Sequence, residues 1–307
     1  MYLEYYLDKL NYQNVPEFME KYLKAPSLLR LKKVGYFCGM DYASKDIYDF
    51  KEYTSRYDHS LAVALITYRF TKSKEACLAG LFHDVATPCF AHVIDYMNKD
   101  YSKQESTEEY TEKILREDEY LLKCLKEDNI NIEDIYDFKK YTIVDNNRPK
   151  LCADRIDGVI LTGISWTKNI SIDDIEKIVD DLTVFTNEYG EEELGFKSED
   201  IAKKVVEVSE SIDVYCHSKE DNFMMELLAQ ITKYAIDKEL FTYDDLYYLN
   251  EDEIWDIIDS RNDKELKEMV NKFKNVKKEE TQYIDLPNVK PRDLNPLVNG
   301  KRVKGEM

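Results

Sequence analysis

The stretch of sequence that decides the fold is LAGLFHDVATPCFAHVID, residues 78–95. It begins with an apolar run typical of a buried helix and reaches the pair His83-Asp84 near the end of that run. Because the residue before a proline disfavours the α conformation, Pro88 predicts that the helix carrying His83 ends near Ala86. A new helix is then expected to start with Pro88 as its first residue.

Apolar, helix-like segments lie on both sides of this stretch. HSLAVALITYRF begins at His59, and LCADRIDGVILTG, residues 151–163, carries Asp154 and Asp157 within an apolar pattern. An aspartate in such a helix is costly to bury unless it is paired or bound to a metal. Three of the four histidines, His59, His83 and His92, fall within 34 residues.

These residue types predict a metal site. A lone histidine on an apolar face is more often a hydrogen-bonded core residue, but here His59 begins one helix and His83-Asp84 ends the next. Side chains at such helix ends can converge on one cavity, and imidazole nitrogens and carboxylate oxygens bind Zn, Mn, Fe and similar ions. Asp154 and Asp157 are the candidates for the remaining ligand.

Three segments in order resemble the HD-domain metal-dependent phosphohydrolases. The segments are SRYDHSLAVA, LAGLFHDVATPCFAHVID and LCADRIDGVI, and the resemblance covers about residues 28–165. They are most similar to the branch that includes the deoxynucleoside triphosphate triphosphohydrolases. The tail VKPRDLNPLVNGKRV is similar to segments near the end of related proteins, with far less specificity.

The resemblance implies a site residue by residue. It implies one divalent metal ion (Mn, Fe, Ni, Zn or Mg) held by His59, His83, Asp84 and Asp154. It also implies that Arg56 contacts the phosphates of the substrate, a task that suits a guanidinium fork.

The resemblance further implies a proton relay beside the metal. His92 and Asp95 lie three residues apart, on one face of a helix, so both can point into one pocket. The expected catalytic residues are therefore His92, Asp95 and Asp84, the last orienting the water. His92 as a structural hydrogen-bonding residue of the core remains an alternative, as does Arg56 as a surface or helix-start residue.

The sequence departs from the family pattern at three positions. Thr87 and Gln104 stand where the family has histidines, and Gly158 stands where it has a tyrosine. Neither Thr nor Gln can shuttle protons at neutral pH. His217, in the polar stretch YCHSKED, is expected at the surface and is no evident replacement.

Three functions therefore stay open. The first is a metal-dependent phosphohydrolase acting on a nucleotide or another small phosphate ester. The second is a catalytically degenerate HD module that binds metal and nucleotide as a regulatory or sensor protein; catalytic turnover separates it from the first. The third is a helical protein in which the His-Asp pair is coincidental, and metal content after purification tests it.

Composition favours an all-α fold. The 307 residues contain only 9 Gly and 7 Pro, and 43% are hydrophobic, enough for a sizeable core. We expect an N-terminal helical segment over 1–27, an HD core over 28–165, further helices over 166–280 and an extended or hairpin tail over 281–307. An Asn-Gly pair between apolar residues supports the hairpin.

Charge and targeting signals limit the partners. The net charge of −19 disfavours nucleic acid and anionic membranes, and no run reaches the roughly 18 apolar residues that span a bilayer. With no evident signal peptide and six cysteines without a CxxC pair, we expect reduced thiols and a cytoplasmic location. The expected partner is a small phosphorylated, nucleotide-like substrate, and family resemblance suggests a homo-oligomer.

The tail contains the one notable basic cluster. Its residues are Lys290, Arg292, Lys301, Arg302 and Lys304. The simplest interpretation is a solvated tail. The alternative is that the tail folds back over a pocket or a subunit interface and meets an anionic ligand.

Overall fold

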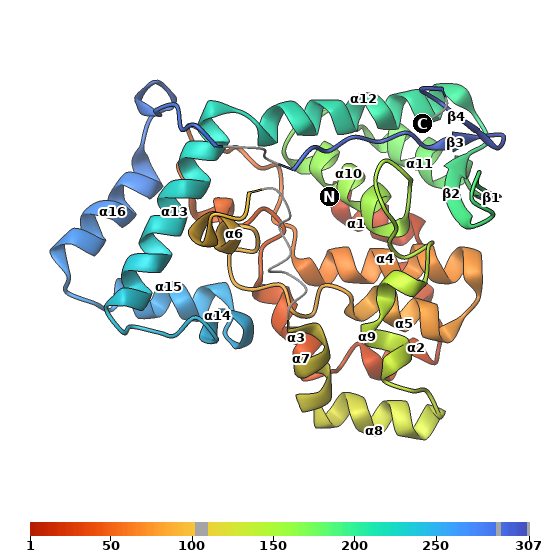
Figure 1. The fold of residues 1–307 in the computed structure, drawn as a ribbon, viewed down its shortest axis with the longest axis horizontal. Coiled ribbons are helices and arrows are strands. Elements are labelled where there is room, and N and C mark those ends of the chain that lie inside the picture. The colour runs from red at the N-terminus through yellow and green to blue at the C-terminus, as the bar shows by residue number, and fades with distance from the viewer. Residues whose placement is uncertain (102–109, 287–289, 306–307) are drawn as a thin grey trace.

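A computed structural model of the chain describes residues 1–101, 110–286 and 290–305, and these are mostly helical (Figure 1). The α-helices are α1 (Tyr2–Lys9), α2 (Met19–Tyr22), α3 (Pro26–Arg30), α4 (Arg56–Thr71), α5 (Lys74–Phe82), α6 (Val93–Asn98), α7 (Thr111–Glu117), α8 (Glu119–Asp128), α9 (Glu133–Tyr136), α10 (Ala153–Ser165), α11 (Ile172–Asp181), α12 (Glu199–Cys216), α13 (Lys219–Asp237), α14 (Asp245–Tyr248), α15 (Glu251–Asp259) and α16 (Lys264–Asn275). Short 3-10 turns lie at Tyr12–Asn14, Leu31–Lys33, Met40–Tyr42, Phe138–Lys140 and Lys278–Glu280.

The helical hairpin α4–α5 forms the centre of the fold. A capping box starts α4: the Ser55 hydroxyl accepts from the amide of Asp58 (3.2 Å), and the Asp58 carboxylate accepts from the amide of Ser55 (2.9 Å). Lys72 ends α4 in the left-handed conformation, and the Ser73 hydroxyl caps α5. Because the connection is so short, the start of α4 lies beside the end of α5.

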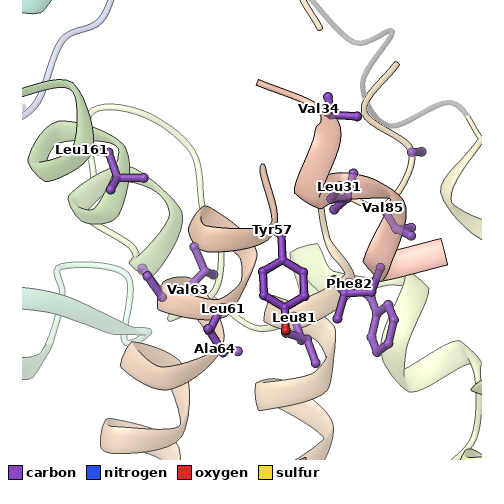
Figure 2. Packing of buried hydrophobic residues seen from close by; sticks show 14 of the residues in the cluster. Leu31, Val34, Tyr57, Leu61, Val63, Ala64, Leu81, Phe82, Val85 and Leu161 are labelled. Atoms are coloured by element: carbon purple, nitrogen blue, oxygen red, sulfur yellow. The ribbon is translucent and has the colours of Figure 1, made fainter. Parts of the chain in front are cut away.

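Apolar side chains hold this hairpin in the core. Figure 2 shows Leu61 and Ala64 of α4 near Leu81 of α5, and Leu161 of α10 near Val63. These residues are at most 1% exposed. Burial of each of the leucine and valine side chains contributes about 1.5–3 kcal/mol. α10 packs along α4, and its first turn places Asp154 close to His59 at the open end of the hairpin.

The C-terminal half adds long helices and a small sheet. α13 packs on α6 and α16, and α12 packs on α10. The sheet has the order β1-β2-β3-β4, with β1 (Leu182–Thr186) antiparallel to β2 (Glu192–Phe196), β2 parallel to β3 (Leu297–Val298), and β3 antiparallel to β4 (Lys301–Arg302). Figure 1 shows the tail running along α12 to reach this sheet.

The all-α fold with a hairpin tail is confirmed, with Asn299-Gly300 at the turn of the hairpin. Other expectations were wrong. The strands β1 and β2 were not predicted, because their apolar residues were interpreted as parts of helices. They are strands because their backbones pair with each other and with the tail, which brings residues about a hundred positions apart together.

The boundaries around the His-Asp pair also differ from prediction. α5 ends at Phe82, so His83 follows the helix instead of lying inside it. No helix starts at Pro88, because Phe90 and Ala91 have φ of +65° and +44°, outside the right-handed helical region. The next helix, α6, begins at Val93.

Candidate metal centre and substrate pocket

Three helix ends bring the predicted metal ligands together. His59 lies in the first turn of α4, His83 directly follows α5, and Asp154 lies in the first turn of α10. One ligand atom from each lies within 4.8 Å of the others. The Asp154 Oδ1 atom is 3.1 Å from His59 Nε2 and 3.7 Å from His83 Nε2. This spacing is compatible with three ligands of one ion.

Each histidine is held by its second ring nitrogen. His83 Nδ1 is 2.8 Å from the carbonyl of Gly80, and His59 Nδ1 is 2.5 Å from Asp157 Oδ2. The Tyr6 hydroxyl in turn donates to Asp157 Oδ1 at 2.7 Å. Such contacts turn the Nε2 atoms towards the shared point, as in metal-binding histidines generally. Asp157, one of two candidates for the remaining ligand, therefore lies behind His59, on the side away from this point.

The donor set fits a divalent cation. His83 Nε2 is buried and has no hydrogen-bond partner among the described residues, an arrangement that is costly for a polar atom unless something else binds it. Two imidazoles and a carboxylate suit Mn, Fe, Ni or Zn. Asp154 keeps 36% of its side chain exposed, so the point between the three groups can be reached from the pocket.

Asp84 lies beside this group and pairs with Arg56. Asp84 Oδ2 is 2.8 Å from Arg56 Nη1 and 3.7 Å from His59 Nε2, while Oδ1 is 3.8 Å from His83 Nε2. Arg56 also donates to the carbonyl of Tyr36 and lies over its ring at 4.8 Å. The structure thus brings Arg56, His59, His83, Asp84 and Asp154 to one place.

The electrostatics of the cluster favour a positive charge. Burial lowers the pKa of His59, but its hydrogen bonds with Asp154 and Asp157 outweigh burial and raise the pKa to about 10. Burial raises the pKa of Asp84, but Arg56 and the two histidines outweigh it and hold that pKa well below its usual range. The carboxylates therefore attract a proton or a metal cation to this point.

A second group of potential ligands is less suitable. Asp145, Cys152 and Asp154 also lie within 4.8 Å of one another. Burial raises the pKa of the Cys152 thiol far above neutrality, and Asp145 is paired with Arg155 at 3.0 Å. A protonated thiol is a poor ligand. All six cysteines are free thiols.

The cluster lies in a cavity of about 770 Å³. The size falls within the range of small-molecule sites. Although the chain is acidic overall, basic side chains outnumber acidic ones in the lining. The basic side chains of the lining are Arg56, Lys139, Arg148, Lys150, Arg155, Lys290 and Arg292. A cation-rich cavity in an acidic protein favours an anionic ligand.

The predicted proton relay is close to this lining. His92 lines the cavity, and its Nδ1 atom is 2.9 Å from Oδ2 of the buried Asp95. Burial lowers the pKa of His92, Asp95 raises it, and the nearby Arg292 and Arg56 lower it further, with a net lowering. His92 is therefore neutral at physiological pH, and its Nε2 is the nitrogen left for other partners.

The basic residues of the tail fall into two groups with different surroundings. Lys290 and Arg292 line the cavity, as the fold-back alternative describes. Arg302 instead pairs with the buried Glu193 at 2.5 Å and with Glu188 at 2.9 Å, which attaches the tail hairpin to β2. The remaining lysines lie away from the cavity: Lys304 pairs with Glu210 and Asp293, and Lys301 is exposed.

The positions that depart from the family pattern have different surroundings. Thr87 is fully buried and is not part of the lining, while Gln104 lies outside the described residues. At Gly158, an added Cβ would lie 2.7 Å from the Tyr36 hydroxyl, so Tyr36 occupies the space beside this glycine. His217 follows α12 and contacts the carbonyl of Asp213.

Several lining residues were not singled out from the sequence. They include Tyr36, Asp145, Arg148, Trp166 and Asp221. Arg148 lies just before the apolar segment at residues 151–163. The sequence carries no local signal for the others, because they reach the cavity from separate segments.

These features define a class of protein: a helical protein with a candidate His/Asp metal site in a cation-lined pocket. The particular family follows from comparison with known proteins. Residues 56–157, about a third of the chain, match the HD domain. All five residues gathered at the candidate centre lie within the matched segment.

Two curated relatives match about the same share of the chain. "Uncharacterized protein YdhJ" of Bacillus subtilis is 28% identical over 143 residues, which are 45% of this chain and 41% of that protein. "Metal-dependent phosphohydrolase cns2" of Cordyceps militaris is 24% identical over 131 residues, 43% of this chain and 37% of that protein. The chain thus spans less than half the length of either relative. Neither name refers to deoxynucleoside triphosphates, so the closer resemblance to that branch stays a prediction.

Across the described residues, no helix combines the length and apolarity needed to cross a lipid bilayer.

Proposed function

We propose that this protein is a metal-dependent phosphohydrolase that removes phosphate from a small, nucleotide-like phosphate ester. The observation that carries the proposal is the buried, unpartnered Nε2 atom of His83, which faces Asp154 and His59 beside the Arg56–Asp84 pair. The HD domain and the name of the Cordyceps relative support the same activity.

His59, His83 and Asp154 would hold the ion, with Asp84 as the fourth group at its edge. A divalent ion there supplies Lewis-acid polarisation of a phosphoryl oxygen and activation of a water molecule. Arg56 can donate to a phosphate oxygen while one of its nitrogens stays on Asp84, because a guanidinium offers five donors. The basic side chains of the lining would hold the rest of the anionic substrate.

His92 is placed to move a proton. With Nδ1 against Asp95, the ring keeps one tautomer and presents Nε2. A neutral imidazole can accept a proton from the attacking water and return it to the leaving oxygen. Asp95 is buried and does not line the cavity, so it acts as a positioning residue for His92.

A regulatory HD module that binds metal and nucleotide without turnover is the second candidate. The burial of Thr87 favours it, since this position offers no proton-transfer group to the pocket. Both candidates require metal, so only turnover separates them.

The test is release of phosphate, pyrophosphate and triphosphate from nucleotides and simple phosphate esters, with Mn, Fe, Ni, Zn or Mg added. The Asp84→Ala variant should lose the release, whereas Asp259→Ala, which changes an exposed carboxylate of α15, should keep it. Absence of release with every metal, from folded and metal-loaded protein, would overturn the proposal and leave the binding module.

A further inference from the structure

A row of aromatic rings leads from the candidate metal centre to the other end of the cavity. The Tyr36 ring is 5.0 Å from the His59 ring and 5.4 Å from Phe37. Phe37 stacks on Phe50 at 4.4 Å with the rings within 12° of parallel, and Phe50 lies 5.4 Å from Tyr48. All these aromatic residues except His59 line the cavity.

Trp166 packs beside this row and extends it into a continuous aromatic surface. Its ring lies 6.1 Å from Phe50, 6.3 Å from Phe37 and 5.8 Å from Tyr48. We call Phe37, Tyr48, Phe50 and Trp166 the aromatic wall; Phe50 and Trp166 are half-buried and offer its accessible surface, whereas Phe37 and Tyr48 are buried. Planar, apolar surfaces of this kind pack against planar rings, as aromatic side chains do against bases.

Asp221 lies where the wall ends. The Tyr48 hydroxyl donates to Asp221 Oδ1 at 2.6 Å, which fixes the carboxyl group. Asp221 is 8% exposed and belongs to the lining. Among the described residues no hydrogen bond reaches its other oxygen, Oδ2, and this atom is not among those sealed in the interior. Oδ2 is therefore open to a ligand.

Asp221 does not return its carboxylate to the N-cap amide of its own helix, although it holds the position from which acidic residues do so elsewhere in this protein. Asp58, Asp174 and Glu253 occupy the third position of α4, α11 and α15, and each returns its carboxylate to the N-cap amide. Asp221 has the same position in α13, after the N-cap Ser218, but its carboxyl group turns to Tyr48 and the cavity instead. This turn leaves the N-cap amide without its usual carboxylate and gives the cavity a polar group.

The protonation of Asp221 and the positive charge of Arg292 determine which ligands this part of the cavity can bind. Burial raises its pKa to about 7, although Tyr48, Arg292 and His217 lower it. A carboxyl group that is half protonated near neutrality can both donate and accept a hydrogen bond. Arg292, which also lines the cavity, disfavours a cationic ligand such as an alkylammonium group.

We propose that Asp221 and the aromatic wall recognise the base of a nucleoside phosphate, with the ring against the wall and its N–H-bearing edge on Asp221 Oδ2. The inference rests on the proposed function in one respect: the phosphate of the same molecule lies at the metal centre. Asp221 acts in specificity; among the described residues it has no hydrogen bond or ion pair with the candidate metal ligands.

The test measures binding and turnover separately. Adenosine, guanosine, cytidine and uridine are titrated into the wild-type protein while the tryptophan fluorescence is followed, since Trp166 belongs to the wall. At least one nucleoside should bind, and Asp221→Asn should weaken that binding at least tenfold. Ribose 5-phosphate, which lacks a base, should bind both proteins equally by calorimetry.

Two further variants complete the design. Tyr48→Phe removes the bond that orients Asp221 and should weaken nucleoside binding by a smaller factor; it replaces Asp221→Asn if that variant does not fold. Glu251→Gln removes another buried carboxyl group, outside the lining, and should bind the nucleoside as wild type does.

The proposal is overturned if no nucleoside binds, if Asp221→Asn binds the nucleoside unchanged, or if phosphocholine binds better than every nucleoside and nucleotide. Nucleoside binding that depends on Asp221, in a protein that releases no phosphate, would instead overturn the hydrolase function and support the recognition site.

Discussion

The two ends of the cavity are built in different ways. At the metal end, Arg56, His59, His83, Asp84 and Asp154 all lie in the matched HD domain, at the ends of three helices. At the other end, the aromatic wall and Asp221 all lie outside residues 56–157. The candidate metal ligands thus fall in the segment that matches the HD domain, while the flanking segments supply the residues proposed to select the substrate.

The difference has a physical basis. Metal ligands need sub-ångström placement, and rigid helix ends with a second layer such as Asp157 and Gly80 supply it. A planar ring needs only a flat apolar surface and one polar group, which loops and distant helices can provide. Each end can therefore be disturbed separately, and the predictions below test that separation.

The largest effect is expected at the metal end. His83→Ala should abolish metal binding and lower phosphate release by about a thousandfold or more, since polarisation and water activation by the ion contribute several kcal/mol and each 1.36 kcal/mol is tenfold. Metal content by mass spectrometry and phosphate release are the measurements. Asp259→Ala, at an exposed carboxylate of α15 outside the cavity lining, is the control and should behave as wild type. Nucleoside binding should survive in both variants; its loss in His83→Ala would break the separation of the two ends.

Arg56→Gln should have the next largest effect. It removes a charge-assisted donor to phosphate, with an expected loss of about 10- to 100-fold in kcat/KM for phosphate esters, since such a bond contributes about 1.5–3 kcal/mol. Arg116→Gln, an exposed arginine of α7, is the matched control. Equal rates for Arg56→Gln and wild type would remove Arg56 from the phosphate site.

Gly158→Ala tests the junction between the two ends. Its Cβ would lie 2.7 Å from the Tyr36 hydroxyl, so the Tyr36 ring must shift between the metal centre and the wall. Overpacking of this kind costs about 1–3 kcal/mol, and we expect a fewfold change in KM with folding retained. Tyr36→Phe in the same background should restore KM, because it removes the clashing oxygen. Failure of this rescue would show that the change does not act through Tyr36.

The smallest effect concerns stability. Glu251 is fully buried, and burial, with Asp41 nearby, raises its pKa from 4.5 to about 8. The folded state thus keeps a proton that the unfolded chain releases, so this group stabilises below pH 4.5 and the contribution falls as pH rises to about 8.

Glu251→Gln carries no such proton. The free energy of unfolding of wild type relative to Glu251→Gln should decrease by up to about 1.4 kcal/mol per pH unit across that window. Urea denaturation at several pH values measures it. A constant difference between the two proteins from about pH 5 to 8 would contradict the shifted pKa, and nucleotide turnover should be unaffected by the substitution.

The sequence by itself determined the helical class, the hairpin tail and the residues that gather at the metal centre. Few breakers and apolar runs with helical spacing predict helices, and His83-Asp84 and Asp154 stand out because polar groups in apolar helices need partners. Local patterns of this kind can be read along the chain.

Only the tertiary structure decided the rest. The early end of α5, the strands β1 and β2, the return of Arg292 to the cavity and the position of Asp157 behind His59 all depend on contacts between distant segments. The aromatic wall and Asp221 show this most clearly. Phe37, Trp166 and Asp221 share no sequence motif. The packing of α4, α10, α12 and α13 brings them to one cavity, and this packing is driven by burial of apolar surface, which does not depend on how far apart residues lie in the sequence.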